Sequence, residues 1–292
     1  MNILVSGANG QLGMELRNIP ASDGDRFVFT DINEMPGCET VYLDITNRDA
    51  VALVCESENI DLIVNCAAYT NVDKAEDDVS TAELLNSTAP GNLASVAAER
   101  GAGLIHISTD YVFGGDATSP IREDAAPDPR SVYGSTKLSG ERAILRSGCK
   151  SIIIRTAWLY SPYGKNFVKT MINLTSSKPE VKVVDDQIGS PTSAADLAAL
   201  IAHIIRTRQH SKCGIYHFTD EGCISWYDFA CAIRDLARTS ADVKPCLSSE
   251  FPSKVNRPHY SVLDKTLVRT TFGFEIPFWK DSLEVCIAKL PK

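Results

Sequence analysis

The segment SGANGQLG at residues 6–13 follows a short apolar run and opens an amphipathic one. Its glycines, Gly7, Gly10 and Gly13, have the spacing G-x-x-G-x-x-G. The first glycine permits a tight turn, the second lets the backbone approach a pyrophosphate, and the third lets helix and strand pack closely. A strand, this turn and a helix in register therefore predict a dinucleotide-binding βαβ unit.

An acidic residue stands where the next strand of such a unit would end. Asp31 closes the apolar run at 27–30 and lies 18 residues beyond Gly13. A carboxylate at this place accepts hydrogen bonds from an adenosine ribose. Because it would repel a 2′-phosphate, Asp31 favours NADH over NADPH.

Apolar runs alternate with amphipathic stretches along the first half of the chain. We expect strands at 2–5, 27–30, 40–43, 61–65, 103–108 and 151–155, and helices at 49–58, 82–100 and 135–146. The alternation predicts an α/β fold with a doubly wound parallel sheet of the Rossmann type. Residues 1–160 are therefore expected to form a dinucleotide-binding domain.

The pattern becomes less regular after residue 160. We expect helices at 166–177, 194–207, 225–237 and 278–290, and strands at 181–184 and 215–218. Residues 161–292 are therefore predicted to form mainly a smaller C-terminal α/β substrate-binding domain, with some segments returning to the Rossmann sheet.

Composition narrows the class of protein. The 292 residues are 44% apolar and carry a formal net charge of −8, which argues against nucleic-acid binding. No apolar run reaches the roughly 20 residues that span a bilayer. The start MNILVSGANG does not resemble an export signal, so we expect a soluble, cytoplasmic protein with nine reduced cysteines. The histidines and cysteines form no ligand-spaced cluster, so we expect no zinc site.

Three polar residues indicate carbonyl reduction. Thr109 ends the fifth predicted strand, and Tyr133 and Lys137 lie four residues apart on one helix face. A hydride that reaches a carbonyl carbon leaves an alkoxide, which needs a proton and hydrogen-bond donors. We predict that Tyr133 donates the proton, that the Lys137 cation lowers the pKa of Tyr133, and that Thr109 donates to the substrate oxygen.

A Tyr–Lys pair alone often lies by chance on a surface helix. Its combination with the glycine turn and the Thr109 strand end favours catalysis over that reading. His106 lies inside the fifth strand, and we interpret it as a hydrogen-bonded sheet residue rather than a catalyst.

Seven segments carry a family resemblance that spans nearly the full chain. They are SGANGQLG (6–13), NCAAYTNVDKAE (65–76), HISTDYVFGG (106–115), VYGSTKLSGE (132–141), RTAWLY (155–160), DQIGSPTSAADLA (186–198) and NRPHYSVLD (256–264). The chain resembles the extended short-chain dehydrogenases and, within them, the dTDP-4-dehydrorhamnose reductases. The resemblance implies NADPH- or NADH-dependent reduction of the 4-keto group of dTDP-4-dehydro-L-rhamnose to give dTDP-L-rhamnose.

The resemblance also assigns site residues. It places Gln11 and Leu12 at the cofactor phosphates, Asp31, Asp44 and Ile45 at the adenosine, and Ala67, Ala68 and Tyr69 along the cofactor. It places Thr109 and Asp110 at the sugar and Trp158 beside the deoxysugar. Arg257 precedes Pro258 in a predicted loop. A fixed guanidinium there would suit a diphosphate, and an arginine that only faces water is an equally good interpretation.

The resemblance further implies a homodimer and, in some members, a magnesium ion shared by acidic residues at the dimer interface. Glu15 matches the first of those acids, but DQIGSPT offers no glutamate to match the second. We therefore interpret Glu15 as a first-turn acid that complements the helix dipole, and we expect no metal site.

Two other functions stay open at this point. A nucleotide-sugar epimerase or 4,6-dehydratase would use the same scaffold, but a dehydratase needs an acid pair near the Ser/Thr, and here Tyr111 follows Asp110. A non-catalytic regulatory subunit resembling that of methionine adenosyltransferase would share the fold without the reaction. The intact Thr109, Tyr133 and Lys137 set favours an enzyme.

Overall fold

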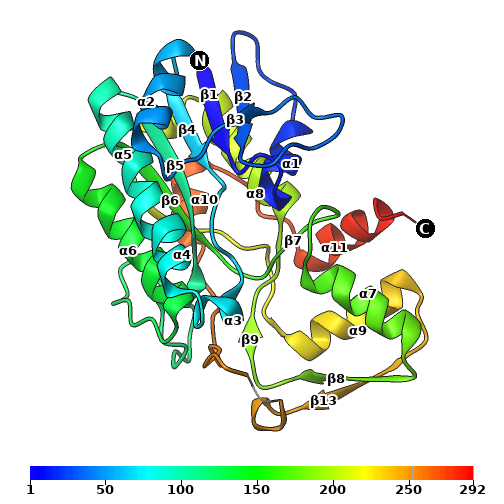
Figure 1. The fold of residues 1–292 in the computed structure, drawn as a ribbon. Helices are drawn as coiled ribbons and strands as arrows, with labels where there is room; N and C mark the ends of the chain where they lie inside the picture. The colour runs from blue at the N-terminus through cyan, green and yellow to red at the C-terminus, as the bar shows by residue number, and fades with distance from the viewer. Residues whose placement is uncertain (252, 292) are drawn as a thin grey trace.

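The computed structural model describes residues 1–251 and 253–291. Its centre is a seven-stranded parallel sheet in the order β11-β6-β5-β4-β1-β2-β3 (Figure 1). The strands are β1 (Asn2–Ser6), β2 (Arg26–Asp31), β3 (Val41–Tyr42), β4 (Leu62–Asn65), β5 (Gly103–Thr109), β6 (Lys150–Thr156) and β11 (Gly214–His217). The predicted doubly wound Rossmann sheet is confirmed.

Helices cover both faces of this sheet, which explains why its strands are apolar along their whole length. One face carries α2 (Arg48–Ser57), α5 (Ala89–Arg100) and α6 (Val132–Ser147), and the other carries α1 (Gln11–Arg17), α8 (Ala194–Arg206) and α10 (Thr266–Phe272). Each face has its own buried core. The segment at 214–217 thus joins the sheet beside β6, although it lies far along the chain.

The predicted helix at 82–100 is wrong as a single element. The chain forms α3 (Val72–Ala75) and α4 (Val79–Glu83), then a π-helical turn η1 (Leu84–Thr88), and only then α5. In the π turn the Asn86 carboxamide bonds both backbone groups of Tyr69, at 2.9 and 3.1 Å. The helix widens where it holds this loop, as π turns near functional sites commonly do.

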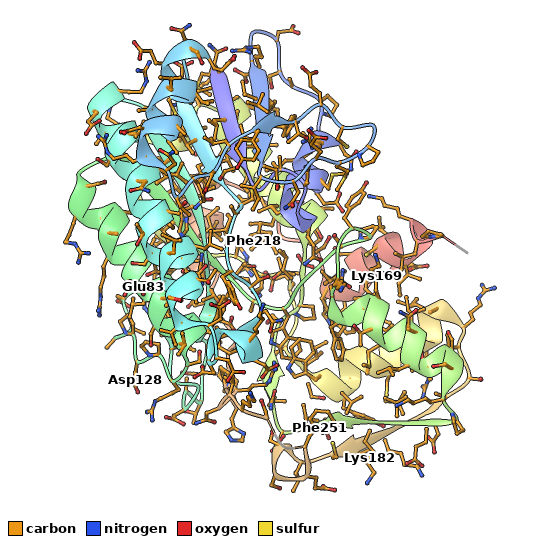
Figure 2. All side chains as sticks on the ribbon, viewed as in Figure 1. Glu83, Asp128, Lys169, Lys182, Phe218 and Phe251 are labelled. Carbon is orange, nitrogen blue, oxygen red and sulfur yellow. The ribbon has the colours of Figure 1, made fainter. Side chains whose placement is uncertain are left out.

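A smaller lobe lies beside the sheet. It packs α7 (Phe167–Ser177), α9 (Trp226–Ala237) and α11 (Trp279–Ala288) on the parallel pair β8 (Glu180–Val184) and β13 (Asp242–Cys246). Val181 and Val183 face its core, whereas Lys182 lies at its outer edge (Figure 2). Sequence reasoning missed β13, because Lys244 and Pro245 interrupt its apolar alternation.

Short elements connect the two parts. They are β7 (Leu159–Tyr160) with β10 (Thr192–Ser193), β9 (Ile188–Gly189) with β12 (Ile224–Ser225), and the turns η2 (Asp110–Val112), η3 (Gln209–Ser211) and η4 (Ser248–Glu250). Among the described residues, none of the helices is both long and apolar enough to cross a bilayer.

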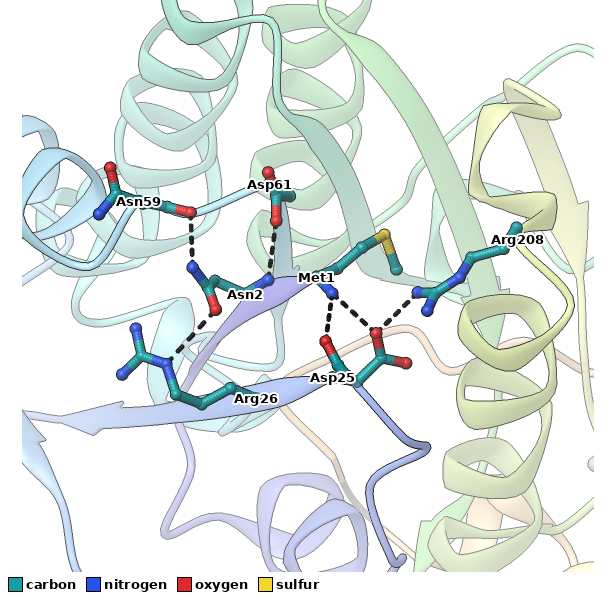
Figure 3. A network of polar contacts seen from close by, with 8 residues as sticks. Met1, Asn2, Asp25, Arg26, Asn59, Asp61 and Arg208 are labelled. Atoms are coloured by element: carbon teal, nitrogen blue, oxygen red, sulfur yellow. Dashed lines mark hydrogen bonds and ion pairs between the residues drawn. The ribbon is translucent and has the colours of Figure 1, made fainter.

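A polar network closes the amino-terminal edge of the sheet (Figure 3). The Met1 ammonium and the Arg208 guanidinium both donate to Oδ1 of Asp25, at 2.9 and 2.7 Å. The backbone N–H of Asn2 donates to Asp61 at 2.8 Å. These bonds fix one end of the strands, and the opposite, carboxyl end carries the candidate site.

Candidate active site

The glycine turn between β1 and α1 leaves no room for side chains. Gly7 has φ +67°, and a Cβ on it would lie 2.6 Å from the backbone nitrogen of Ala67. A Cβ on Gly13 would lie 2.5 Å from the Cα of Ala8. Gly10 is the N-cap of α1 and presents only backbone to the helix entrance. The turn therefore fits the close approach of a dinucleotide pyrophosphate.

The two residues after Gly10 have different surroundings. The Gln11 Oε1 accepts a hydrogen bond from Asn166 at 2.9 Å, which links α1 to the loop before α7. Leu12 is 4% exposed and packs into the core beneath the sheet. Its backbone, rather than its side chain, is what a phosphate could reach.

The residues predicted for the adenosine side of the cofactor end β2 and follow β3. Asp31 accepts from the backbone N–H of Asn9 at 3.1 Å and from that of Asn33 at 3.0 Å. The Asp44 carboxylate accepts from the backbone N–H of Thr46 at 2.9 Å. Ile45 is buried in the core. Asp31 is therefore held by the glycine turn and by the loop after β2, and Asp44 is held by its own loop.

Two asparagines that sequence reasoning missed hold the loop after β4, which contains Ala67, Ala68 and Tyr69. Asn65 Oδ1 accepts from the N–H of Ala67 at 3.1 Å, and Asn86 Oδ1 accepts from that of Tyr69 at 2.9 Å. Both asparagines are at most 1% exposed. Their sequence signal was a polar residue closing the apolar run DLIVN and another inside a helical stretch.

Thr109 and Asp110 lie buried at the carboxyl end of β5. The Thr109 hydroxyl donates to Oδ1 of Asp110 at 3.0 Å and accepts from the N–H of Tyr111 at 3.2 Å. Oδ2 of Asp110 has no hydrogen-bond partner among the described residues. Burial raises the pKa of Asp110 to about 6, against hydrogen bonds from Thr109 and Ser261.

Tyr133 and Lys137 occupy the first turns of α6, which begins after the N-cap Ser131. Tyr133 contacts Tyr111 edge to face at 5.5 Å between ring centres. Burial raises the pKa of Tyr133, and a hydrogen bond with Thr109 opposes this rise. Lys137 donates to the Ile107 carbonyl at 2.6 Å, and burial lowers its pKa to about 8.

The predicted lowering of the Tyr133 pKa is therefore wrong in this structure. The Lys137 ammonium is directed at the β5 backbone rather than at the phenol, and desolvation dominates at Tyr133. A raised pKa keeps Tyr133 protonated at neutral pH, which is the form that a proton donor needs.

Trp158 and Arg257 lie farther out. Trp158 follows β6 with the left-handed φ of +49°, and its ring stacks on Trp226 with 3.6 Å between centres. Arg257 donates to Oδ2 of Asp73 at 2.7 Å. It also forms a hydrogen bond with the Tyr111 hydroxyl, which opposes the rise that burial causes in the pKa of Tyr111. Lys254 pairs with Asp77 at 2.7 Å in the same way. The loop that carries Arg257 is thus bound to α3.

Glu15 lines a different cavity. It shares a space of about 260 Å³ with Asp196, Asp281 and Lys289, between α1, α8 and α11. Burial raises the pKa of both Glu15 and Asp196. Within residues 1–251 and 253–291, no three His, Cys, Asp or Glu side chains are grouped to hold a metal ion. The magnesium ion that the resemblance raised is not supported.

The structure brings most of the predicted residues to one edge. The glycine turn, Asp31, the Ala67–Tyr69 loop, Thr109 and Trp158 follow the carboxyl ends of β1, β2, β4, β5 and β6. Ligands in open α/β sheets bind at this edge. The sheet, the glycine turn and the Thr109, Tyr133 and Lys137 set define the class of protein as an extended short-chain dehydrogenase.

Comparison with known proteins gives the family. The family model described as RmlD substrate binding domain matches residues 1–291. The chain is 39% identical over 292 residues to the dTDP-4-dehydrorhamnose reductase of Aggregatibacter actinomycetemcomitans, and 97% of each chain is covered. It is 38% identical over 288 residues to that of Escherichia coli K12, covering 96% of this chain and 95% of the relative.

Solved structures of dTDP-4-dehydrorhamnose reductases are similar to this chain over nearly its full length. A dTDP-4-dehydrorhamnose reductase from Clostridium acetobutylicum has a TM-score of 0.91 at 42% identity, with 99% of both chains covered. One from Bacillus anthracis, in complex with NADP, has a TM-score of 0.90 at 36% identity, also with 99% of both chains covered. The chain belongs to the RmlD family of dTDP-4-dehydrorhamnose reductases.

Proposed function

We propose that this chain reduces the 4-keto group of dTDP-4-dehydro-L-rhamnose to give dTDP-L-rhamnose, with NADPH or NADH as the reductant. The observation that carries the proposal is the set of buried Thr109, half-buried Tyr133 and buried Lys137 at the carboxyl end of β5, in a chain 39% identical to such a reductase.

The side chains would divide the chemistry among them. NAD(P)H, when bound, supplies the hydride. Tyr133 gives its proton to the developing alkoxide, and its raised pKa keeps that proton in place until then. Thr109 orients the carbonyl oxygen between Tyr133 and Asp110. Lys137, anchored on Ile107, stands one helical turn from Tyr133 and holds the nicotinamide ribose.

The cofactor would lie along the glycine turn. The backbone at Gly7, Gly10, Gln11, Leu12 and Gly13 receives the phosphates. The side chains and backbone of Asp31, Asp44, Ile45, Ala67, Ala68 and Tyr69 line the rest. The relative from Bacillus anthracis is in complex with NADP, which supports NADPH beside NADH as a cofactor of this chain.

The dTDP-linked keto-deoxysugar would lie between the sheet and the smaller lobe. Asp110 and Thr109 contact the sugar, and Trp158 packs against the deoxysugar. Arg257 binds the diphosphate by exchanging its contact with Asp73 for a phosphate oxygen, since guanidinium matches both anions. The cofactor part would comprise residues 1–160 with β11, α8 and α10, and the substrate part the rest of residues 161–292.

A second keto-sugar should be tested as a substrate in the same assay. A relative in Streptomyces antibioticus, 39% identical over 286 residues, is described as a probable dTDP-4,6-dihydroxy-2-methyloxan-3-one 4-ketoreductase.

The deciding experiment follows the absorbance of NADPH and of NADH with each keto-sugar and identifies the product by NMR. Stoichiometric cofactor oxidation with formation of dTDP-L-rhamnose supports the proposal. Conversion without net cofactor loss would instead indicate an epimerase or dehydratase. If neither keto-sugar is turned over and the chain co-purifies with a methionine adenosyltransferase, the result would indicate a regulatory subunit.

We also propose a cytoplasmic location and a homodimer. All nine cysteines are free thiols, which supports a reducing compartment. Light scattering on the purified protein measures the oligomeric state.

A further inference from the structure

Arg17, the last residue of α1, has a guanidinium whose hydrogen-bond partners are all uncharged. Its nitrogens donate to the carbonyl oxygens of Ala8 at 3.3 Å and Glu39 at 2.8 Å, and to the side-chain oxygens of Asn9 at 3.0 Å and Thr40 at 2.9 Å. Within the part of the chain that the structure describes, Arg17 forms no ion pair. Because an arginine stays charged at any ordinary pH, this cation is free to bind an anion from outside the chain.

The guanidinium lies at the corner that would receive the adenosine ribose. Its Cζ is 4.3 Å from the centre of the Phe29 ring on β2. Asp31 comes two residues later on the same strand, and residues i and i+2 of a strand face the same side of the sheet. The backbone N–H of Asn9 donates to Asp31 at 3.1 Å, and the Asn9 side-chain oxygen accepts from Arg17 at 3.0 Å. Arg17 and Asp31 are therefore neighbours in this corner, with Asn9 between them.

Thr40 adds a hydroxyl to the same corner, from the loop before β3, the strand that pairs with β2. Its Oγ1 accepts from Arg17 at 2.9 Å and lies 3.3 Å from both the Asn9 Oδ1 and the Cys38 carbonyl oxygen. Both of these contacts are long for an O–H donor, whose hydrogen bonds are commonly about 2.7 Å. The Thr40 hydroxyl can therefore turn to a stronger acceptor at little cost.

We propose that Arg17 and Thr40 form the binding site for the 2′-phosphate of NADPH, so that the chain accepts NADPH as well as NADH. The inference rests on the proposed function and concerns the cofactor end of the same site. Arg17 keeps the bonds from Nε and Nη1 to the two backbone carbonyls, while its Nη2 and the Thr40 hydroxyl turn from Asn9 to phosphate oxygens. Guanidinium N–H groups bind phosphate through short, charge-assisted hydrogen bonds. With NADH, the same corner offers Asp31 to the ribose hydroxyls.

The balance of charge explains how one corner serves both cofactors. Asp31 alone would repel a phosphate, but the pair of Asp31 and Arg17 is neutral overall. Of the other acids nearby in sequence, Asp44 accepts two hydrogen bonds within its own loop, and Glu34 and Glu39 are exposed, where water and salt screen their charge. A guanidinium suits this role better than an ammonium, because its rigid fork can hold the two carbonyls and still present N–H groups to a phosphate.

Direct binding of the two cofactors tests the proposal without any keto-sugar. NADPH and NADH differ only by the 2′-phosphate, and fluorescence titration of the full chain gives the Kd of each. In Arg17→Gln we expect the Kd of NADPH to rise about tenfold or more, the scale of a lost charge-assisted hydrogen bond, and that of NADH to change by less than about twofold. Arg17→Lys keeps the charge without the fork, so its Kd for NADPH should lie between those of the parent and Arg17→Gln.

Arg26→Gln is the matched control, and both of its Kd values should equal those of the parent. Arg26 also lies on β2, but at the amino-terminal edge of the sheet (Figure 3), where it donates to Glu58 at 2.8 Å. If Arg17→Gln does not fold, Thr40→Val decides, since it removes one hydroxyl and should weaken NADPH binding alone. Equal weakening of both cofactors, or unchanged NADPH binding, in the folded variant would overturn the proposal. Reduction of the keto-sugar by the parent is measured separately, so the proposed function does not depend on this result.

Discussion

At the scale of single residues, the site brings the half-buried phenol of Tyr133 close to the buried hydroxyl of Thr109 and the buried carboxyl of Asp110. The Thr109 hydroxyl donates to Oδ1 of Asp110 at 3.0 Å. Its hydrogen bond with the Tyr133 phenol opposes the rise in the pKa of Tyr133. The residue types were predictable, because carbonyl reduction needs a proton donor and hydrogen-bond donors. The charge states were not predictable, since they depend on burial that appears only after folding.

Removal of the Tyr133 hydroxyl tests the proton donor. Tyr133→Phe should lower turnover by about 100-fold or more, on the scale of a lost general acid. The fold and the affinity for NADPH should stay near those of the parent, which circular dichroism and fluorescence titration measure. Near-parental turnover in the well-folded variant would refute the role of Tyr133.

Asp110 should make stability depend on pH. Its pKa is raised from 3.8 to about 6, so the folded state binds a proton more tightly than the unfolded state. Its stabilising contribution is complete below the unfolded pKa and is lost as pH rises through about 6. The loss is of the order of 3 kcal/mol.

Urea unfolding of the parent and of Asp110→Asn measures this effect. The difference in unfolding free energy between the two proteins should move in favour of the variant as pH rises from about 4 to about 7. A difference that is constant with pH would mean that Asp110 titrates normally.

Asp31 tests cofactor choice. Asp31→Asn keeps an oxygen for the N–H of Asn9 or Asn33 but removes the charge. We expect kcat/KM with NADPH to rise relative to NADH, because a 2′-phosphate is no longer repelled. Asp31→Ala should shift the ratio in the same direction while also loosening the loop. An unchanged ratio in both variants would show that Asp31 does not contact the ribose.

At the scale of elements, periodicity located the sheet and most helices, since buried parallel strands are apolar along their length. Periodicity failed where a contact with a distant part of the chain determines the backbone conformation. Asn86 widens the helix at η1 through its bonds to Tyr69, and nothing within 82–100 reveals that partner. The helix at 135–146 begins earlier, at Val132, because Ser131 caps it through the N–H of Gly134 at 3.0 Å.

The packing of α1 on the glycine turn tests an element contact. Gly13→Ala places a Cβ 2.5 Å from the Cα of Ala8, and backbone there cannot yield locally. We expect a loss of about 1–3 kcal/mol in stability and weakened NADPH binding. Gly91→Ala in α5 is the matched control, since its Cβ would lie 3.4 Å from that of Ala143. Equal stability in the two variants would contradict the close packing of α1.

At the scale of the whole molecule, the site could be predicted only in part. Segments such as 6–13 and 132–141 carry enough local chemistry to be recognised, and their elements arise from neighbours in sequence. The contact between Asn65 and His106 could not be recognised in this way. These residues are 41 positions apart in the sequence and meet only because β4 and β5 are neighbours in the sheet. The pairing of Arg257 with Asp73 depends on contact across 184 residues.

Binding of NADPH should stabilise the whole chain. A ligand that binds only the folded state, at a hundredfold excess over its Kd, adds about 2.7 kcal/mol. The melting temperature should rise with NADPH concentration in the parent and much less in Gly13→Ala. A melting temperature that is insensitive to NADPH would mean that the glycine turn does not receive it.

The distribution of free thiols has a practical consequence. Of the nine cysteines, only Cys213 and Cys223 are exposed. Cys213 precedes β11 in the sheet, whereas Cys223 precedes β12, which pairs with β9 beside the smaller lobe. The native chain therefore carries two accessible attachment points for a pair of fluorescent dyes. Energy transfer between such dyes would report whether the two halves of the molecule approach each other when cofactor and nucleotide sugar bind.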